Sequence, residues 1–364
     1  MTRKLRVGAF ITSHGFGHGT RACAVLNEVI RLTGCELQVF STLPNWFYSQ
    51  NIFSQELKIH QVKTDIGLVQ KSPFVHDLAK TIHELKNFLD FDCKDYNIIR
   101  KIVQGGSFDL IISDISPLGI KLADELNIPS VLIENFTWDW IYAKYCLSHP
   151  PFNEIIRRLQ HIFETANLHI QAIPYSEEKS STIKVPPISR SIHHDPNEIR
   201  NRLNICKSSK IVLLTTGGIT KSLTLINKLT NYTDCTFIIS NNQDKISRDQ
   251  NIISMPLNSN YHYPDLVNAS NLVVGKVGYG TLAECWSTNT PLLGCYRKDF
   301  RESRPLKIFA DKNLSHKEIS IDDFEKMNWM ENAREIMLQE IKINYCSKTS
   351  GSIKAAQAIV GLIK

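Results

Sequence analysis

Short apolar segments alternate with segments of helical periodicity through the first half of the chain. The apolar segments predict strands over residues 5–12, 36–41, 57–62, 110–113 and 128–133. Apolar residues at helical spacing predict helices over residues 20–32, 75–103 and 118–126, and a further helix beginning within 138–145. Strands that alternate with helices predict an α/β fold with a parallel sheet.

The alternation stops in a stretch rich in proline and serine and then starts again. Beyond it, the pattern predicts helices over residues 197–203, 222–229, 263–268 and 280–287, and strands over 211–215, 236–240, 252–255, 272–275 and 291–295. We therefore predict an N-terminal domain (1–173), a linker (174–195), a C-terminal domain (196–340) and a final helical segment (341–364) that packs back on the first domain. The two halves are expected to form separate sheets.

Composition places the chain among ordinary globular proteins and gives no sign of a nucleic-acid or membrane protein. Its 364 residues suit two domains of roughly 150–200 residues, and 42% are hydrophobic and 21% charged. The net charge of +6 comes from scattered Lys and Arg, which suits a phosphorylated small molecule and does not require nucleic acid. Nine cysteines without a CxxC pair indicate reduced thiols and no zinc site. The chain has neither a signal-peptide core nor an apolar span of about 18 residues, so we expect a cytoplasmic protein, and peripheral membrane contact has no support.

A glycine-rich segment of the second half, residues 275–284, follows a predicted strand and leads into a predicted helix. Gly278 and Gly280 allow a ligand to approach the backbone, and the N–H groups of a helix N-terminus suit a diphosphate. Glu284 lies three residues after Thr281, so its carboxylate either turns toward a ribose diol or forms a capping box with Thr281. The segment predicts a phosphate-binding turn, with a purely structural glycine turn as the alternative.

A second glycine-rich loop lies between the first predicted strand and helix. It contains His14, Gly15, Gly17, His18 and Arg21, and it does not match GxGxxG. Open α/β sheets bind ligands at the carboxyl end of such a strand, so His18 is a candidate acid–base residue. Asp114 ends another strand at the same predicted edge, where it either works with His18 or caps the next helix.

Two further loops follow strands of the second half. Gly217 and Gly218 form a turn that would expose bare backbone to a phosphate, and Asp299 and Glu302 follow the last strong strand, where they would contact a sugar. The charged run around Asp299 is equally typical of a solvated loop.

Three segments together resemble the GT-B glycosyltransferases: residues 14–21, residues 135–142, and residues 275–281 with Glu284. Within that superfamily the chain is most similar to the glycosyltransferase-like N-terminal domain of L-arabinokinases. Its second half also resembles the N-acetylglucosaminyltransferase that makes the peptidoglycan lipid intermediate. This resemblance implies a GT-B fold, with two Rossmann-like domains whose parallel sheets face an interdomain cleft. It also implies that Thr281 and Glu284 contact the diphosphate and the ribose of a UDP-sugar.

The resemblance has limits that narrow the expected activity. No sugar-kinase domain and no GxxxxGK[ST] loop follow in this sequence, so kinase activity is not expected. The Gly-Phe-Gly-His loop also resembles that of sugar-nucleotide hydrolases of pseudaminic acid synthesis, where the histidine serves hydrolysis.

The expected function is inverting, metal-independent transfer of a sugar from a nucleotide-diphosphate sugar, with a UDP-sugar favoured, to an unidentified acceptor hydroxyl. His18 and Asp114 are the predicted catalytic residues, and no cofactor or metal is expected. The predicted donor-binding residues are Gly15, Gly17, Arg21, Gly217, Gly218, Gly278, Gly280, Thr281, Glu284, Asp299 and Glu302. The predicted acceptor-side residues are His14, Asn135, Trp138 and Asp139. The alternatives are a sugar-nucleotide hydrolase or epimerase that uses the same site, and a noncatalytic nucleotide-sugar sensor.

Overall fold

The computed structural model describes residues 3–72, 75–216, 225–241, 244–339 and 350–363. The chain divides into two compact units. Unit 1 comprises Met1–Ile188, Asp299–Glu302 and Thr349–Lys364, and unit 2 comprises Ser189–Lys298 and Ser303–Lys348. The break after Ile188 lies within the predicted linker. Residues 299–302, placed in the C-terminal domain from the sequence, instead belong to unit 1.

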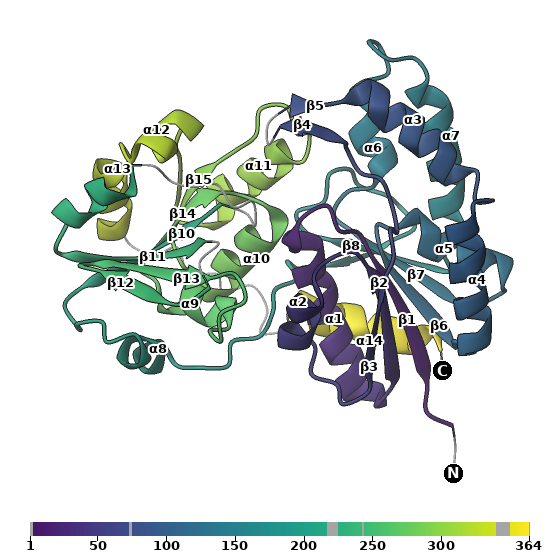
Figure 1. The fold of residues 1–364 in the computed structure, drawn as a ribbon, viewed down its shortest axis with the longest axis horizontal. Helices are drawn as coiled ribbons and strands as arrows, with labels where there is room; N and C mark the ends of the chain where they lie inside the picture. The colour runs from purple at the N-terminus through teal and green to yellow at the C-terminus, as the bar shows by residue number, and fades with distance from the viewer. Residues whose placement is uncertain (1–2, 73–74, 217–224, 242–243, 340–349, 364) are drawn as a thin grey trace. The chain divides into compact units, whose positions relative to one another are not determined.

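Unit 1 is built on a seven-stranded parallel sheet with the order β3-β2-β1-β6-β7-β8-β9 (Figure 1). Its strands are β1 (Arg6–Ile11), β2 (Glu36–Ser41), β3 (Leu57–Gln61), β6 (Leu110–Asp114), β7 (Ser130–Glu134), β8 (Leu168–Ala172) and β9 (Ile183–Val185). A separate antiparallel pair joins β4 (Gln70–Ser72) to β5 (Val75–His76). Because the strand order reverses between β1 and β6, the carboxyl ends of these two strands form the switch point of the sheet, where open α/β sheets bind ligands.

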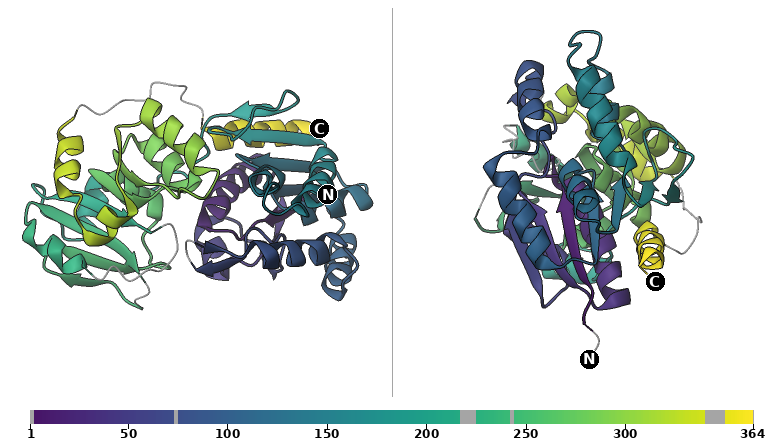
Figure 2. Two further views of the ribbon diagram at one scale, coloured as in Figure 1. Left: turned by 90° about the horizontal axis from the view of Figure 1, so that it is seen from above. Right: turned by 90° about the vertical axis from the view of Figure 1, so that its right-hand side faces the viewer.

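Helices cover both faces of this sheet (Figure 2). They are α1 (Phe16–Thr33), α2 (Asn45–Asn51), α3 (Leu78–Leu89), α4 (Lys94–Gly106), α5 (Pro117–Glu125), α6 (Trp138–Ala143), α7 (Phe152–Glu164) and α14 (Gly351–Leu362). Helices α4 and α5 pack on Phe10 and Phe40 of the sheet. Helix α14 packs on α1, and its first residue approaches the backbone so closely that a Cβ on Gly351 would lie 2.1 Å from the Pro186 carbonyl oxygen.

Unit 2 repeats the same architecture with the strand order β12-β13-β11-β10-β14-β15-β16. Its strands are β10 (Lys210–Thr215), β11 (Cys235–Asn241), β12 (Ser247–Asp249), β13 (Ile252–Pro256), β14 (Leu272–Lys276), β15 (Leu292–Cys295) and β16 (His316–Glu318). Its helices are α8 (Pro196–Arg202), α9 (Tyr263–Ala269), α10 (Tyr279–Thr288), α11 (Ser303–Asn313), α12 (Ile321–Lys326) and α13 (Met330–Leu338), with a 3-10 helix at Ile226–Asn231. Among the described strands of unit 2, only the edge strand β12 pairs antiparallel, with β13. The switch point here lies between β10 and β14.

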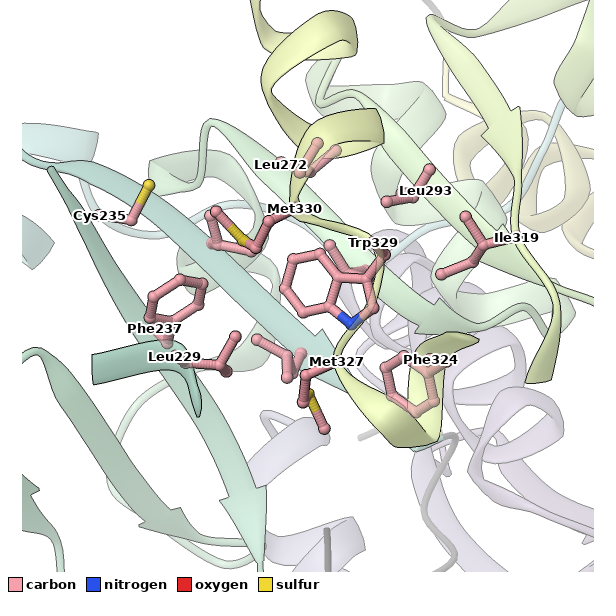
Figure 3. Packing of buried hydrophobic residues seen from close by; sticks show 14 of the residues in the cluster. Leu229, Cys235, Phe237, Leu272, Leu293, Ile319, Phe324, Met327, Trp329 and Met330 are labelled. Carbon is pink, nitrogen blue, oxygen red and sulfur yellow. The ribbon is translucent and has the colours of Figure 1, made fainter. Parts of the chain in front are cut away.

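The core of unit 2 is closed on one side by the segment between α12 and α13. Trp329 is fully buried and packs among Leu272, Leu293, Phe324 and Met330 (Figure 3). A buried tryptophan of this size fills the space between the sheet and the two helices, which gives unit 2 a hydrophobic core of its own.

The structure confirms two separate parallel sheets and corrects several predicted elements. The helix predicted over residues 75–103 is instead strand β5 followed by two helices, because Phe91 adopts a φ of 51° that ends the first helix. Part of the predicted linker forms the edge strand β9. The sequence pattern missed α7 and β8. Of the helix predicted over residues 222–229, residues 222–224 lie outside the described residues, and the described part belongs largely to the 3-10 helix Ile226–Asn231.

Candidate functional site

The first part of the candidate site lies at the switch point of unit 1. Asp114 ends β6 directly beside Ile11, the last residue of β1. The chain then turns at Gly15, whose φ of 105° and ψ of 157° are accessible almost only to glycine, and α1 begins at the next residue. His18 therefore lies in the first turn of α1, above the end of β6. This local geometry explains the need for Gly15, which the sequence analysis assigned to donor binding.

His18 and Arg21 both contact the Asp114 carboxylate. The Nδ1 atom of His18 lies 3.0 Å from Asp114 Oδ1, and Arg21 donates two hydrogen bonds of 2.7 Å, one to each oxygen of the same carboxylate. Burial raises the pKa of Asp114, but the Arg21 charge and the hydrogen bonds from His18 and Arg21 outweigh it and hold this pKa below its ordinary value. Asp114 is therefore an ionised partner for the imidazole at neutral pH.

Arg21 has no surface available for a ligand in this structure. It is fully buried; besides contacting Asp114, its guanidinium donates to the side-chain oxygen of Asn135, and its Nη2 lies 3.1 Å from His18 Nδ1. The predicted donor contact of Arg21 is thus replaced by a contact that organises Asp114. Asn135, predicted on the acceptor side, is also buried and donates through Nδ2 to Glu302 Oε1 at 2.8 Å.

The segment with Asp299 and Glu302 belongs to unit 1, contrary to the sequence-based assignment to the second half. Glu302 is 7% exposed and faces Asn135, whereas the Asp299 side chain is 81% exposed. The sequence interpretation failed because it assumed that residues after β15 stay with their own sheet. In this structure the four residues Asp299–Glu302, although they follow β15 of unit 2, belong to unit 1.

Two of the four predicted acceptor-side residues, His14 and Trp138, lie against the loop with Asp65 and Gly67, which was not among the predicted site segments. Trp138 donates through Nε1 to Asp65 Oδ2 at 2.7 Å, and the His14 ring meets the Trp138 ring edge-on at 5.0 Å. Gly67, with a φ of 61°, lets the loop approach His14, since a Cβ there would lie 2.6 Å from His14 Nδ1. Asp139 is buried, and its Oδ1 has no hydrogen-bond partner among the described residues. His14 is the more accessible member of the group, and Trp138 is 1% exposed.

Asp65 is a carboxyl near His18 that the sequence analysis did not single out. Burial raises its pKa, although hydrogen bonds from Thr12 and Trp138 and the nearby His18 oppose the rise. Its position just after β3, at the carboxyl edge of the sheet, is the sequence signal that could have revealed it.

The second part of the candidate site lies at the switch point of unit 2, where β14 leads into α10. Gly275 has a φ of 139°, and a Cβ there would lie 1.9 Å from the Thr215 carbonyl oxygen, so this position requires glycine. Gly278 is the N-cap of α10, and it supplies no side-chain hydrogen bond to the first turn. That turn also lacks acidic residues, which favours an anion at this helix end. Gly280 and Thr281 lie in that turn, and Gly217 and Gly218 are outside the described residues.

Glu284 does not form the capping box that the sequence allowed. The helix begins at Tyr279, so Thr281 is its third residue and Glu284 lies a further turn along. Glu284 is 2% exposed, and its Oε1 accepts hydrogen bonds of 2.8 and 2.6 Å from Nε and Nη2 of Arg190. Burial raises the pKa of Glu284, and the Arg190 charge opposes that rise. Arg190 lies in the proline-rich stretch, where no pattern pointed to it.

A group of polar side chains holds the segment after Arg190 against α9. Asp265 is fully buried and accepts hydrogen bonds from the backbone N–H groups of His193 and His194 and from His194 Nδ1. The His193 and His262 rings stack with centroids 4.1 Å apart. Burial, together with Arg190 and His193, lowers the pKa of His262 to about 4, so this ring is neutral at pH 7.

The described part of the chain shows no metal centre. No group of three or more His, Cys, Asp or Glu residues suited to a metal ion occurs there. The sequence does contain one DxD spacing, at Asp90 and Asp92, but it lies between α3 and α4, where Asp90 pairs with Arg158 at 3.1 Å. Over the same residues no helix has the length and apolar character needed to cross a membrane.

Comparison with known proteins agrees with the fold described above. No protein-family model matches the chain. L-arabinokinase of Arabidopsis thaliana is 26% identical over 304 residues, a match that covers 80% of this chain and 28% of that protein. The chain thus corresponds to little more than a quarter of that relative, and the likeness to L-arabinokinases inferred from the motifs is confirmed.

Solved structures of glycosyltransferases share the fold over the whole chain. They include the glycotransferase of kitacinnamycin (TM-score 0.64, 11% identity, 100% of both chains) and the calicheamicin glycosyltransferase CalG4 (TM-score 0.63, 10% identity, 100% of this chain and 94% of that one). Arabidopsis thaliana UGT89C1 complexed with UDP is similar at a TM-score of 0.62 and 12% identity, over 99% of this chain and 100% of that one. At such identities the similarity establishes the fold, and the chain has the GT-B fold expected from its sequence.

Proposed function

We propose that this protein is a glycosyltransferase that moves a sugar from a UDP-sugar to an acceptor hydroxyl, with inversion and without a metal ion. The observation that carries the proposal is the His18–Asp114 pair at the switch point of unit 1, where His18 Nδ1 lies 3.0 Å from an ionised carboxylate. The GT-B fold, which UGT89C1 shows with UDP bound, supports it.

The pair suits general-base chemistry. His18 Nδ1 lies 3.0 Å from Asp114 Oδ1, which only accepts, and 3.1 Å from Arg21 Nη2, which only donates. Both Arg21 hydrogens on that side already serve the carboxylate, so in this proposal the imidazole proton is on Nδ1, toward Asp114, and Nε2 is the basic atom. In the proposed step Nε2 takes the proton of the acceptor hydroxyl while its oxygen bonds to the anomeric carbon. The bond from that carbon to the diphosphate oxygen breaks, and UDP departs with the electron pair. Attack opposite the leaving group inverts the anomeric centre.

The leaving diphosphate would gain its stabilisation from the N-terminus of α10. Gly278 leaves the first turn uncapped, and the partial positive charge of a helix N-terminus favours an anion. In this proposal Glu284 receives the ribose hydroxyls, and the side chains around His14 and Trp138 face the acceptor. The 28% coverage of L-arabinokinase gives no ground for carrying its kinase activity to this chain.

The proposal is tested by incubating the protein with a panel of UDP-sugars, with and without alcohol and sugar acceptors, and measuring free UDP and the glycosylated product. We expect acceptor-dependent UDP release that EDTA leaves unchanged. Release at equal rates without any acceptor would replace the transferase by a hydrolase. UDP-sugar binding without any release would replace it by a sensor.

The catalytic assignment is tested on His18. His18→Ala should bind UDP as the parent does and turn over roughly 10²–10⁴-fold more slowly, which is the usual contribution of a positioned base. Asp114→Asn should also slow turnover if that carboxylate orients the imidazole. His83→Ala, which changes an exposed histidine of the same unit, is the matched control. Normal turnover in folded His18→Ala protein would refute the base assignment.

A further inference from the structure

Five side chains of unit 1 form a continuous hydrogen-bonded chain that ends at the proposed base. Glu302 accepts from Asn135, Asn135 accepts from Arg21, Arg21 holds the carboxylate of Asp114, and Asp114 faces Nδ1 of His18. We call these five residues the buried relay. They come from α1, from the carboxyl ends of β6 and β7, and from the 299–302 segment.

The direction of the buried relay follows from what each group can donate. A guanidinium only donates, so the amide oxygen of Asn135 must face Arg21, and its NH₂ group must then face the carboxylate of Glu302. The Asn135 amide therefore has one orientation. Because it hydrogen-bonds to both Glu302 and Arg21, the position of Glu302 constrains that of the guanidinium.

The charges within the buried relay do not balance while the imidazole is neutral. With Arg21 protonated and both carboxyl groups, Asp114 and Glu302, ionised, their sum is one negative charge. None of the five residues is more than 8% exposed, so water compensates this excess poorly. A proton on His18 cancels the excess. Glu302 thus favours the protonated imidazole, the state that follows removal of a proton from an acceptor.

The segment that carries Glu302 is fixed on unit 1 by several independent contacts. Phe300 is buried against the Phe136 ring, and the Arg301 guanidinium lies 4.0 Å from the ring centroid of Trp140 and donates to its carbonyl oxygen. Lys144 donates to the Asp299 carbonyl oxygen at 3.1 Å. Glu302 is therefore held in place and is not a solvated loop residue.

The Arg21 guanidinium also faces the ring directly, with Nη2 3.1 Å from His18 Nδ1, and its positive charge opposes protonation, so the two carboxylates of the buried relay must outweigh it. The other titratable groups described near His18 supply no comparable negative charge. Asp65 is buried, with a raised pKa, and its carboxylate is engaged by Trp138 and Thr12. On α2, burial raises the pKa of Tyr48 well above its ordinary value, so that phenol stays neutral. Helix α14, which packs on α1, carries one ionisable side chain, Lys354, and it is exposed.

We propose that Glu302 is a positioning residue that acts through Asn135, Arg21 and Asp114 to orient His18 and to favour its protonated form. The effect of Glu302 on turnover rests on the function proposed above, whereas the effect of Glu302 on the proton affinity of His18 does not. This role differs from the sugar contact that the sequence suggested for Glu302.

The test is an NMR titration of the protein labelled with ¹⁵N-histidine, with the His18 signals assigned by their loss in His18→Gln. In Glu302→Gln, which keeps the hydrogen bond from Asn135 but removes the charge, the midpoint of the His18 titration should fall, by about tenfold in proton affinity. Glu134→Gln is the matched control, because it neutralises a buried carboxylate of the same unit that binds His169 and Gln171 and is not part of the buried relay. In Glu134→Gln the midpoint of the His18 titration should stay close to that of the parent.

Two further measurements separate positioning from stability and from the proposed activity. Glu302→Asp keeps the charge and should show a smaller fall, and it serves as the test variant if Glu302→Gln does not fold. In the active enzyme, the acid limb of the kcat–pH profile should move with the titration while the KM for the UDP-sugar is unchanged. Unchanged midpoints in the folded Glu302 variants, or an equal fall in Glu134→Gln, would overturn the proposal. A shifted midpoint in a protein that never releases UDP would sustain the buried relay and refute the transferase.

Discussion

At the scale of single residues, buried charges in this protein come with a partner, and the partner decides what a substitution does. Glu284 and Arg190 are buried together, so removing either one leaves the other without its counter-charge. Loss of one member of a buried pair typically costs about 3–5 kcal/mol of stability. Tests of function at such a pair therefore need substitutions that keep the hydrogen bond.

Glu284→Gln is the appropriate variant for the proposed ribose contact. It should weaken UDP binding by roughly 1–3 kcal/mol, the usual loss for a hydrogen bond to a charged group, as measured by titration calorimetry. Glu331→Gln, an exposed position on α13, makes the same chemical change away from the site and should leave affinity unchanged. Parent-like UDP affinity in Glu284→Gln would reduce Glu284 to a structural partner of Arg190.

His262 gives unit 2 a pH dependence of known sign. Its pKa is about 4 in the folded state, below the usual value near 6.5, so the unfolded chain binds the proton more tightly between these values. Stability should therefore fall as the pH falls from about 6.5 to about 4. The ring is partly exposed, so we expect a loss of roughly 2 kcal/mol, less than the full shift implies.

The measurement is urea unfolding of the parent and of His262→Gln across this pH range. The difference between the two should shrink at low pH, because the variant lacks the group that protonates on unfolding. His83→Gln, at an exposed position, should follow the parent. If the free energy of unfolding of His262→Gln changed with pH in parallel with that of the parent, this histidine would not be held neutral by its surroundings.

At the scale of elements, two glycines of α14 play opposite roles. A Cβ on Gly351 would lie 2.1 Å from the Pro186 carbonyl oxygen, whereas nothing lies within 4 Å of a Cβ on Gly361. Gly351→Ala should therefore separate the helix from its neighbour and lower the Tm of unit 1. Gly361→Ala should stabilise the protein by up to about 1 kcal/mol, because alanine is the better helix former.

Differential scanning calorimetry of the two variants checks this prediction. If close packing at the start of α14 determines the fit of this helix, Gly351→Ala lowers the Tm and Gly361→Ala raises it, although the chemical change is the same. A Tm for Gly351→Ala equal to that of the parent would mean that the helix moves away at no cost.

The sequence predicted elements well where local pattern and tertiary fold agree. Apolar runs and glycines in the sequence predict strand β1, the loop with His18, and the turn from β14 into α10. The predictions failed where a distant contact decides the structure. Glu302 joins unit 1 because Phe300 finds an apolar site there, and Arg190 becomes important through Glu284, 94 residues away. No local pattern encodes either pairing.

At the scale of the whole molecule, unit 2 is almost continuous in sequence, and unit 1 is not. Residues 189–348 contain all of unit 2 together with the short 299–302 excursion. If the donor site lies wholly within unit 2, this fragment should fold and bind UDP with nearly the affinity of the full chain. Replacing Phe300 by Ser in the fragment removes an apolar side chain that would lose its partners in unit 1.

Circular dichroism and UDP titration of the fragment test this prediction. The fragment with Glu284→Gln serves as the control for specific binding. A folded fragment that fails to bind UDP would mean that residues of unit 1 are needed to hold the nucleotide, and the donor assignment would then be wrong.

The dependence of unit 1 on α14 also sets an order for synthesis on the ribosome. The sheet of unit 1 is translated by residue 188, but the helix that packs on α1 is added only after unit 2 has been made. About 160 residues intervene, which takes roughly 8–32 s at about 5–20 residues per second. During that interval the nascent chain carries an apolar face of α1 that nothing from its own sequence has yet covered. Protection by a chaperone would matter most for this protein within that window of translation, and a ribosomal pause over residues 189–348 would lengthen the window.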